Sequence, residues 1–326
     1  MARHFLQSSE WAMVQKALGN RVFQKTTDAY SYLAIVQNGR AAKRLYTPYG
    51  PTIYDVNNPK RALEQATNDL KTLATANHLD FIRLEPRSSY EIENAFSPNN
   101  PQTVQLSEKM LTDLGFMRAS HDAQPSDTLV KDISSPFDSI LGAATKYKRK
   151  YWRQNQRAGV QFSVSYDVED VQKMLRIMKT VYEGKNIMPF PDDYYVTIAK
   201  TLFPTQNAGL TFAELDNKIM ASYMFYKDET TMYNVHGAGL DEFRKLSPSS
   251  TLLFYEQGLA HDLGLKWFDY FGIAPENAPE THPYAGFTSF KQQFGGTRVH
   301  TLGTWELPLK HIKYRIYRTL LERFGG

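Results

Sequence analysis

The sequence predicts an α+β protein made of two similar units in tandem. The chain has 326 residues, which is long for one small domain and suits two domains of ordinary size. Its 42% hydrophobic and 22% charged residues are typical of a folded globular protein. One order of elements (helices, antiparallel strands, a helix and a strand) occurs twice along the chain.

The first copy has the clearest single helix. Its predicted elements are a short helix around Trp11, strands over 30–39 and 41–55, a helix over 57–79 and a strand over 80–86. Asn58 is expected to cap the long helix, and Pro59 suits its first position. Apolar residues on one helical face support it, namely Leu63, Ala66, Leu70 and Leu73.

The second copy repeats this order. Its predicted elements are helices over 167–184 and 192–203, a strand meander over 209–239, a helix over 247–264 and a strand over 265–272. Asp167 is expected to cap the first of these helices, and Ser249 or Ser250 the last. The turns of the meander are predicted at 214–218 and 227–230.

This order of elements is typical of GNAT-like domains, the fold of acyl-CoA N-acyltransferases. The predicted fold class is therefore α+β with two tandem GNAT-like domains. The first domain is placed at 1–137 and the second at 138–307. The basic helix over 308–326 is expected to pack back on the first domain.

Composition excludes several classes of site. The chain has no cysteine, so disulfides, thiolate nucleophiles and cysteine-ligated zinc are excluded. Its 8 histidines form no HxxxH or HExxH pattern, so no metal or other cofactor is expected. No signal peptide or apolar run of membrane-spanning length is present, which predicts a cytoplasmic protein without a transmembrane segment.

Positive charge is concentrated in one segment. The formal net charge is +4, but residues 146–157 carry six Lys or Arg side chains and no acid, which leaves −2 for the rest. No Asp or Glu occurs from Ser139 to Tyr166. Basic side chains with Tyr147, Tyr151 and Trp152 among them suit a nucleic-acid backbone with stackable bases. A solvated helix face is the alternative.

The segment 287–296, FTSFKQQFGG, sets one lysine among three phenylalanines. A partly desolvated Lys291 could stabilise an oxyanion at an ester carbonyl, or hold a phosphate or carboxylate. The pair Gly295-Gly296 allows a close backbone approach. The alternative is a surface loop with a solvated lysine above buried phenylalanines.

Two further polar residues, Glu85 and His236, could have a functional or a structural role. Glu85 ends a predicted strand and could take a proton from an attacking ammonium. A salt bridge from Glu85 to Arg83 or Arg87 is the alternative. His236 is expected to be structural. The segment FRKLSPSS, before the last helix of the second copy, lacks the glycine-rich loop by which acetyltransferases hold coenzyme A.

Four segments occur in the order seen in the Fem peptidyltransferase family. They are YTPYGP at 46–51, RQNQRAGV at 153–160, WFDYFGI at 267–273 and FTSFKQQFGG at 287–296. The chain resembles the short, FemX-like members over roughly residues 5–320, since no heptad pattern predicts the coiled-coil arm of longer members. The resemblance implies that the two units face each other across a cleft.

The resemblance also implies an activity and its partners. Family members transfer an amino acid from aminoacyl-tRNA to the stem-peptide amine of a peptidoglycan precursor, either UDP-MurNAc-pentapeptide or its lipid-linked form. Lys291 would stabilise the transition state, and Glu85 stands at the position of a possible base. The basic segment would bind tRNA, through Lys146, Lys148, Arg149, Lys150 and Arg153. Substrate contacts are expected at Phe290, Tyr194, Tyr233, Lys16 and Tyr46.

The sequence departs from the family at two acceptor-binding positions. Gln15 replaces a substrate-binding lysine, with Lys16 beside it, and Phe190-Pro191 replaces Arg-Pro. The acceptor therefore stays open between nucleotide-linked and lipid-linked forms. Two other interpretations also remain: an acyl-CoA-dependent N-acyltransferase of the same fold, and a non-catalytic RNA-binding protein.

Overall fold

The computed structural model describes residues 3–39, 41–97, 105–183 and 189–324. The chain forms two compact units, one made of Met1–Ser126 and Val299–Gly326 and the other of Asp127–Arg298. These bounds differ from the expected 137/138 and 307/308. Strand β8 (Asp127–Asp132) pairs with β13 (Trp267–Ile273) of the second unit, and β15 (Trp305–Pro308) pairs with β5 (Phe81–Leu84) of the first.

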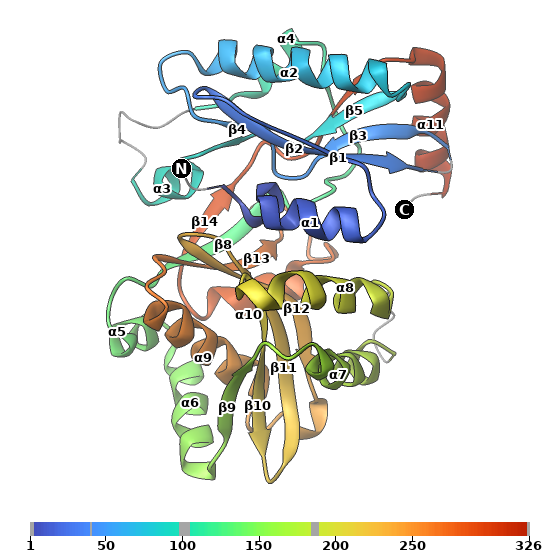
Figure 1. The fold of residues 1–326 in the computed structure, drawn as a ribbon. Coiled ribbons are helices and arrows are strands. Elements are labelled where there is room, and N and C mark those ends of the chain that lie inside the picture. Colours follow the sequence, from blue (N-terminus) through green and yellow to red (C-terminus); the bar gives the residue numbers. More distant parts are fainter. Residues whose placement is uncertain (1–2, 40, 98–104, 184–188, 325–326) are drawn as a thin grey trace. The chain divides into compact units, whose positions relative to one another are not determined.

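The first unit is built around one mixed sheet of eight strands (Figure 1). Besides β5 and β15, its strands are β1 (Val22–Thr26), β2 (Tyr30–Asn38), β3 (Lys43–Thr47), β4 (Thr52–Ile53), β6 (Arg87–Ser88) and β7 (Met117–Arg118). The order is β6-β4-β2-β3-β5-β15-β7, and β1 also pairs with β2. Strand β15, from the end of the chain, thus lies inside this sheet, between β5 and β7.

Helices cover both faces of the first sheet (Figure 1). They are α1 (Ser9–Ala17), α2 (Pro59–Ala76), α3 (Glu91–Phe96), α4 (Glu108–Asp113) and α11 (His311–Phe324). The predicted long helix is confirmed as α2, which buries Ala62, Leu63, Ala66, Leu70 and Ala74. Asn58 occupies the predicted N-cap position, but its side chain makes no capping hydrogen bond, and the Asp55 carboxylate accepts from the Asn57 and Asn58 amides.

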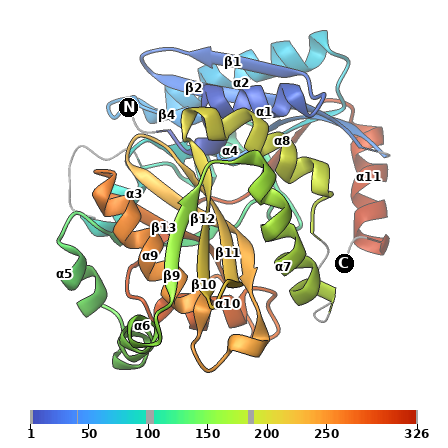
Figure 2. The same cartoon turned by 60° about the horizontal axis from the view of Figure 1, so that its bottom comes forward.

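The second unit has a seven-stranded sheet in the order β14-β8-β13-β12-β11-β10-β9 (Figure 2). Its further strands are β9 (Gln161–Ser165), β10 (Ala208–Leu215), β11 (Lys218–Lys227), β12 (Thr231–Gly239) and β14 (Thr297–His300). The predicted meander is confirmed, because β10, β11 and β12 pair antiparallel in sequence order. Its turns occur at the two predicted places.

The helices of the second unit are α5 (Phe137–Gly142), α6 (Lys146–Ala158), α7 (Val171–Glu183), α8 (Asp192–Leu202), α9 (Pro248–Asp262) and α10 (Ala285–Gln292). Asp167 caps a short 3-10 turn that precedes α7, accepting from the Glu169 amide. Ser249 and Ser250 do not cap α9. They lie inside its first turn, because Pro248 occupies the first helical position and Ser247 precedes it.

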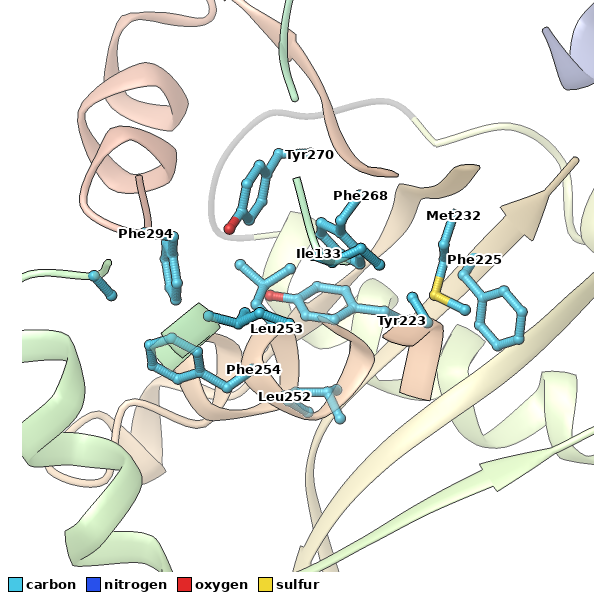
Figure 3. Close-up of a cluster of buried hydrophobic side chains, with 14 of the residues drawn as sticks. Ile133, Tyr223, Phe225, Met232, Leu252, Leu253, Phe254, Phe268, Tyr270 and Phe294 are labelled. Atoms are coloured by element: carbon cyan, nitrogen blue, oxygen red, sulfur yellow. The ribbon is translucent and has the colours of Figure 1, made fainter. Parts of the chain in front are cut away.

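A hydrophobic core lies between α9 and one face of the second sheet. Figure 3 shows Leu253 and Phe254 of α9 near Phe268 and Tyr270 of β13, with Phe294 beside them. All of these side chains are at most 2% exposed. This core fixes the position of β13 and of the chain just after α10, which together carry the candidate site.

Strands β12 and β13 run parallel but separate early. In the described part of the chain, their pairing covers only residues 231–233 of β12 and 267–269 of β13. Strand β12 continues to Gly239 and β13 to Ile273.

Candidate active site

Strand β13 is distorted next to the place where it leaves β12. Its pairing with β8 shifts register between Asp269 and Gly272, which marks a β-bulge. Within the bulge Phe271 has a φ of 62°, in the left-handed region that bulky residues rarely adopt. Its N–H donates to the Asp269 carboxylate over 2.7 Å. Backbone strain of this kind concentrates at functional sites.

Lys291 lies against this bulge. It belongs to α10, and its Nζ donates to the Gly272 carbonyl oxygen over 2.6 Å. Burial lowers the pKa of Lys291 to about 8, although the nearby Asp269 carboxylate acts to raise it. The residue keeps partial exposure. Lys291 is therefore a weakly solvated ammonium on a partly exposed side chain, held beside strained backbone.

The phenylalanines of 287–296 mostly surround a different lysine. Lys148 places its Nζ 4.1 Å from the centre of the Phe290 ring and 5.0 Å from that of Phe294. For Lys291 the closest such distance is 5.9 Å, to Phe287. The Phe290 ring is therefore in contact with Lys148, a residue that is only 4% exposed. A substrate that binds Phe290, as predicted, would compete with this contact.

Gly295 and Gly296 approach backbone of their own unit. Their φ angles are 78° and 120°, both in the range that favours glycine. A Cβ at Gly296 would lie 2.7 Å from the Val130 carbonyl oxygen, and one at Gly295 3.1 Å from that of Ala143. The close approach predicted from the glycine pair is thus an internal contact that seats the chain after α10 on β8.

The predicted basic segment forms helix α6, and most of its cations share one face. Lys146, Arg149, Lys150, Arg153 and Arg157 recur at helical spacing, and all except the partly exposed Arg149 are exposed. Tyr147, beside them, is 57% exposed. Lys148 points the other way: its Nζ donates to Ser250 Oγ over 2.8 Å, and burial lowers its pKa to about 8. Its predicted contact with tRNA is corrected, because the ammonium is inside the unit.

Glu85 lies in the first unit, whereas Lys291 lies in the second. Its buried carboxylate accepts four hydrogen bonds, from Tyr46 Oη (2.8 Å), the Tyr49 amide (3.2 Å), the Gln124 amide (2.7 Å) and Thr304 Oγ1 (2.7 Å). Burial raises the pKa of Glu85, and these bonds oppose the rise.

The salt bridges expected for Glu85 do not match this geometry, and its role as a base stays a prediction. The alternative salt bridges are absent among the described residues, because Arg83 pairs with Glu306 and Arg87 with Glu91. A carboxylate offers about four lone-pair positions, and Glu85 uses four of them internally. The structure therefore favours a positioning role, in which Glu85 ties together three separate segments of the first unit.

The other predicted substrate residues fall in different settings. Lys16 is exposed on α1, and Tyr46 is buried against Glu85. Tyr194 is partly exposed and stacks on Phe190 with ring centres 4.4 Å apart. Tyr233 is 2% exposed and donates to Asp228 Oδ2 over 2.5 Å, so its hydroxyl is not available to a substrate.

Buried polar groups of the second unit were missed from sequence. Lys131 donates to the Ile140 and Phe294 carbonyls and to Gln257, and burial lowers its pKa to about 8. Burial also raises the pKa of Glu256 to about 7, although its carboxylate accepts from Thr211 and Asn234. A charged residue within an apolar segment, such as Lys131 in DTLVKDI, is the one sequence signal for such a group.

His236, which was expected to be structural, lies among aromatic rings. It is surrounded by Tyr195 and Tyr226 at ring distances of 5.2 and 6.0 Å, and burial lowers its pKa to about 4. Among the residues that the structure describes, no group of three His, Asp or Glu side chains could hold a metal ion. Nor does any described helix have the length and apolarity required to span a bilayer.

Comparison with known proteins supports the fold. Residues 143–284 match the family model described as an acetyltransferase (GNAT) domain. The search of curated proteins found no match. Among solved structures, FemX matches with a TM-score of 0.81 at 16% identity, over 97% of this chain and 94% of that one.

Two further structures are similar over most of the chain. A C-terminal domain assigned to a lysylphosphatidylglycerol synthetase of Agrobacterium fabrum has a TM-score of 0.57 at 11% identity, over 97% of this chain and 92% of that one. A tandem GNAT protein from the clavulanic acid biosynthesis pathway has a TM-score of 0.50 at 10% identity, over 86% and 79%.

These findings define a class of protein before any activity. The chain has an acyltransferase architecture, with two tandem GNAT-like units in an α+β fold. Within that class its fold is that of FemX, which confirms the predicted fold and the expected resemblance.

Proposed function

We propose that this protein transfers an amino acid from aminoacyl-tRNA to the stem-peptide amine of a peptidoglycan precursor, in the cytoplasm. The observation that carries the proposal is Lys291, a partly exposed ammonium held against the strained β13 bulge. The FemX fold and the basic face of α6 support it. One structural neighbour is named for a lysylated product, which suits a fold that transfers amino acids.

The reaction needs no covalent enzyme intermediate, because the donor is already an activated ester. The acceptor amine attacks the ester carbonyl, the C–O bond to the tRNA ribose breaks, and the tRNA hydroxyl leaves with a proton while the amine loses one. Charge develops on the carbonyl oxygen in the transition state. An ammonium in weakly solvated surroundings stabilises that oxygen far better than one in bulk water.

Binding of tRNA is assigned to the exposed face of α6. Lys146, Lys150 and Arg153 lie on it, and the sequence of α6 contains no Asp or Glu. Such a face neutralises phosphates without reading sequence, so binding should weaken as salt rises. The acceptor stays open between the nucleotide-linked and lipid-linked precursors, with Lys16 and Tyr194 as predicted contacts.

The first test is transfer of a labelled amino acid from charged tRNA to a muropeptide acceptor. Lys291→Ala should lower kcat by about 100-fold or more, the usual cost of removing one oxyanion donor. Lys218→Ala, which removes an exposed lysine of β11, is the matched control and should keep the wild-type rate. A near wild-type rate for Lys291→Ala would remove Lys291 from the mechanism.

The second test is the salt dependence of tRNA binding. Replacing Lys146, Lys150 and Arg153 by Gln should reduce the slope of log Kd against log salt by roughly one for each phosphate that the variant no longer neutralises. The control replaces Lys179, Lys200 and Lys218, which are exposed outside α6. An unchanged slope in the α6 variant would place the tRNA elsewhere.

An acyl-CoA-dependent N-acyltransferase is the second candidate, and the match of residues 143–284 to an acetyltransferase domain favours it. Against it, the segment FRKLSPSS before α9 lacks the glycine-rich loop by which acetyltransferases hold coenzyme A. Retention on a coenzyme A column, with acyl transfer from acyl-CoA and none from charged tRNA, would favour this candidate.

A further inference from the structure

Helix α11 carries large apolar side chains on its outward side. Ile312 is 79% exposed, Ile316 54% and Leu320 40%. They are spaced four residues apart, so they form one stripe along a helix with 3.6 residues per turn. Tyr314, Tyr317 and Leu321 occupy the opposite side and pack with Ala42 and Phe81 of the first unit. The outward stripe is therefore separate from the side chains that pack α11 on the first unit.

Cations flank this apolar stripe. The segment 310–324 contains Lys310, Lys313, Arg315, Arg318 and Arg323, with Glu322 as its one acid, so it carries +4. The whole chain is +4 and the segment 146–157 is +6, which leaves −6 for all other residues. Two basic helices thus stand out from an acidic remainder, and α11 is the one that also exposes aliphatic side chains in a row.

Part of this charge is held in place by the first unit. Lys310 and Lys313 lie 2.9 and 3.7 Å from the buried Asp80 carboxylate, while their side chains stay 43% and 61% exposed. Arg315 is exposed beside the apolar stripe, and the exposed Arg323 follows the stripe in line near the end of the helix. The helix therefore presents aliphatic side chains together with cations; Figure 1 shows its ribbon along one edge of the first unit.

We infer that the outward face of α11 (Ile312, Ile316, Leu320, Arg315 and Arg323) docks on an anionic lipid surface. A helix that lies in the interface of a bilayer buries an aliphatic strip at the headgroup boundary and sets Lys and Arg beside anionic headgroups. At 14 residues, α11 is too short to span and suits a position in the plane of the surface.

Other occupants fit this face less well. A nucleic acid would pair with the cations but leave the three aliphatic side chains without a partner. A second copy of the chain, packed about a two-fold axis, would set the basic face of α11 against the same basic face of the other copy. An anionic bilayer can bind the aliphatic side chains and the cations of this face at the same time. This inference concerns vesicle binding alone and does not rest on the proposed transfer reaction.

Vesicle flotation with the full chain tests the inference. Wild-type protein should float with vesicles of phosphatidylcholine and phosphatidylglycerol, and much less with phosphatidylcholine alone. The variant Ile312→Ser/Ile316→Ser/Leu320→Ser keeps every charge, and its partition should fall by about tenfold or more. The matched control Val56→Ser/Met117→Ser/Leu263→Ser removes three apolar side chains of 39–43% exposure outside α11 and should float as wild type does.

A site-specific probe separates docking by α11 from general charge attraction. The chain has no cysteine, so Ile316→Cys carries a single environment-sensitive dye. The dye should shift to shorter wavelength when phosphatidylglycerol vesicles are added, whereas the same dye at Val56→Cys should not. This readout also works if the serine variant proves unstable, which thermal unfolding would reveal.

Three outcomes would overturn the inference. They are failure of wild type to float at low salt, equal flotation of the α11 serine variant, and an unshifted dye at position 316. A dimer that the serine variant disrupts, together with absent flotation, would assign the face to a second copy.

Discussion

Three lysines of the second unit share a pKa lowered to about 8 by burial, yet their surroundings differ. Lys131 donates to three acceptors and Lys148 to one hydroxyl beneath two phenylalanine rings, and both are 4% exposed. Lys291 keeps partial exposure and donates to a single carbonyl. Only an ammonium that a substrate can reach stabilises charge on it, so geometry distinguishes Lys291 where the pKa does not.

The single-turnover rate should depend on the charge of Lys291. The lysine is an ammonium below its pKa of about 8 and neutral above it, so the single-turnover rate should fall as pH rises through about 8. Lys291→Arg keeps its charge over this range, since arginine stays protonated. The variant should be slower but lack the alkaline fall. The same fall in both proteins would assign it to another group.

Glu85 offers a test between base and positioning residue. In Glu85→Gln the side-chain N–H₂ group faces hydrogen-bond donors from which the carboxylate accepted. Because two donors cannot bond to each other, the free energy of unfolding should drop by about 1–3 kcal/mol. The rate, measured where both proteins are folded, should change little. Glu64→Gln, on the exposed side of α2, is the control. A large loss of rate with unchanged stability would instead support Glu85 as the base.

At the scale of elements, α6 and the chain after α10 meet through Lys148, and this contact escaped sequence reasoning. The sequence predicted the basic segment, the strand meander and the lysine near aromatic rings. It could not show that Phe290 and Phe294 hold Lys148, since helical phase alone leaves open which cation of a basic run turns inward. The bulge at Phe271 was likewise invisible, because it depends on pairing with β8, far away in sequence.

The buried Lys148 should make stability depend on pH. Its pKa is about 8 in the folded state and near 10.5 when unfolded, so unfolding takes up a proton between these values. Relative to Lys148→Met, the free energy of unfolding of wild type should therefore rise with pH, by about 1.4 kcal/mol per unit between pH 8 and 10. Urea titrations at several pH values measure this. Lys146→Met, exposed on the same helix, should show no such difference.

At the scale of the whole molecule, the two units differ in how the chain builds them. The second unit is continuous, whereas the first requires both Met1–Ser126 and Val299–Gly326. The returning segment supplies β15 inside the sheet, and Glu306 on it pairs with the buried Arg83. The repeated element order predicted both units from sequence, but it placed this strand in the wrong one, because no local pattern shows which sheet a short strand joins.

Truncation before β15 should disrupt the first unit and leave the second unit folded. A chain that ends at His300 lacks β15 and α11, which leaves Arg83 buried without its carboxylate and opens the sheet between β5 and β7. The first unit should then lose its cooperative unfolding transition, while residues 127–300 alone should give a dispersed NMR spectrum. Retained order in the first unit of the truncated chain would contradict the role assigned to β15.

The inserted position of β15 also sets the order in which the units mature on the ribosome. Translation delivers residues 1–126 of the first unit before the second unit, but the strand that completes their sheet emerges after it. Until then β5 presents an open edge, a template for unwanted strand pairing. The second unit, whose residues are consecutive, can finish first. Nascent chains of this protein should therefore depend on chaperones chiefly through their N-terminal part, the reverse of the usual N-to-C sequence of domain folding.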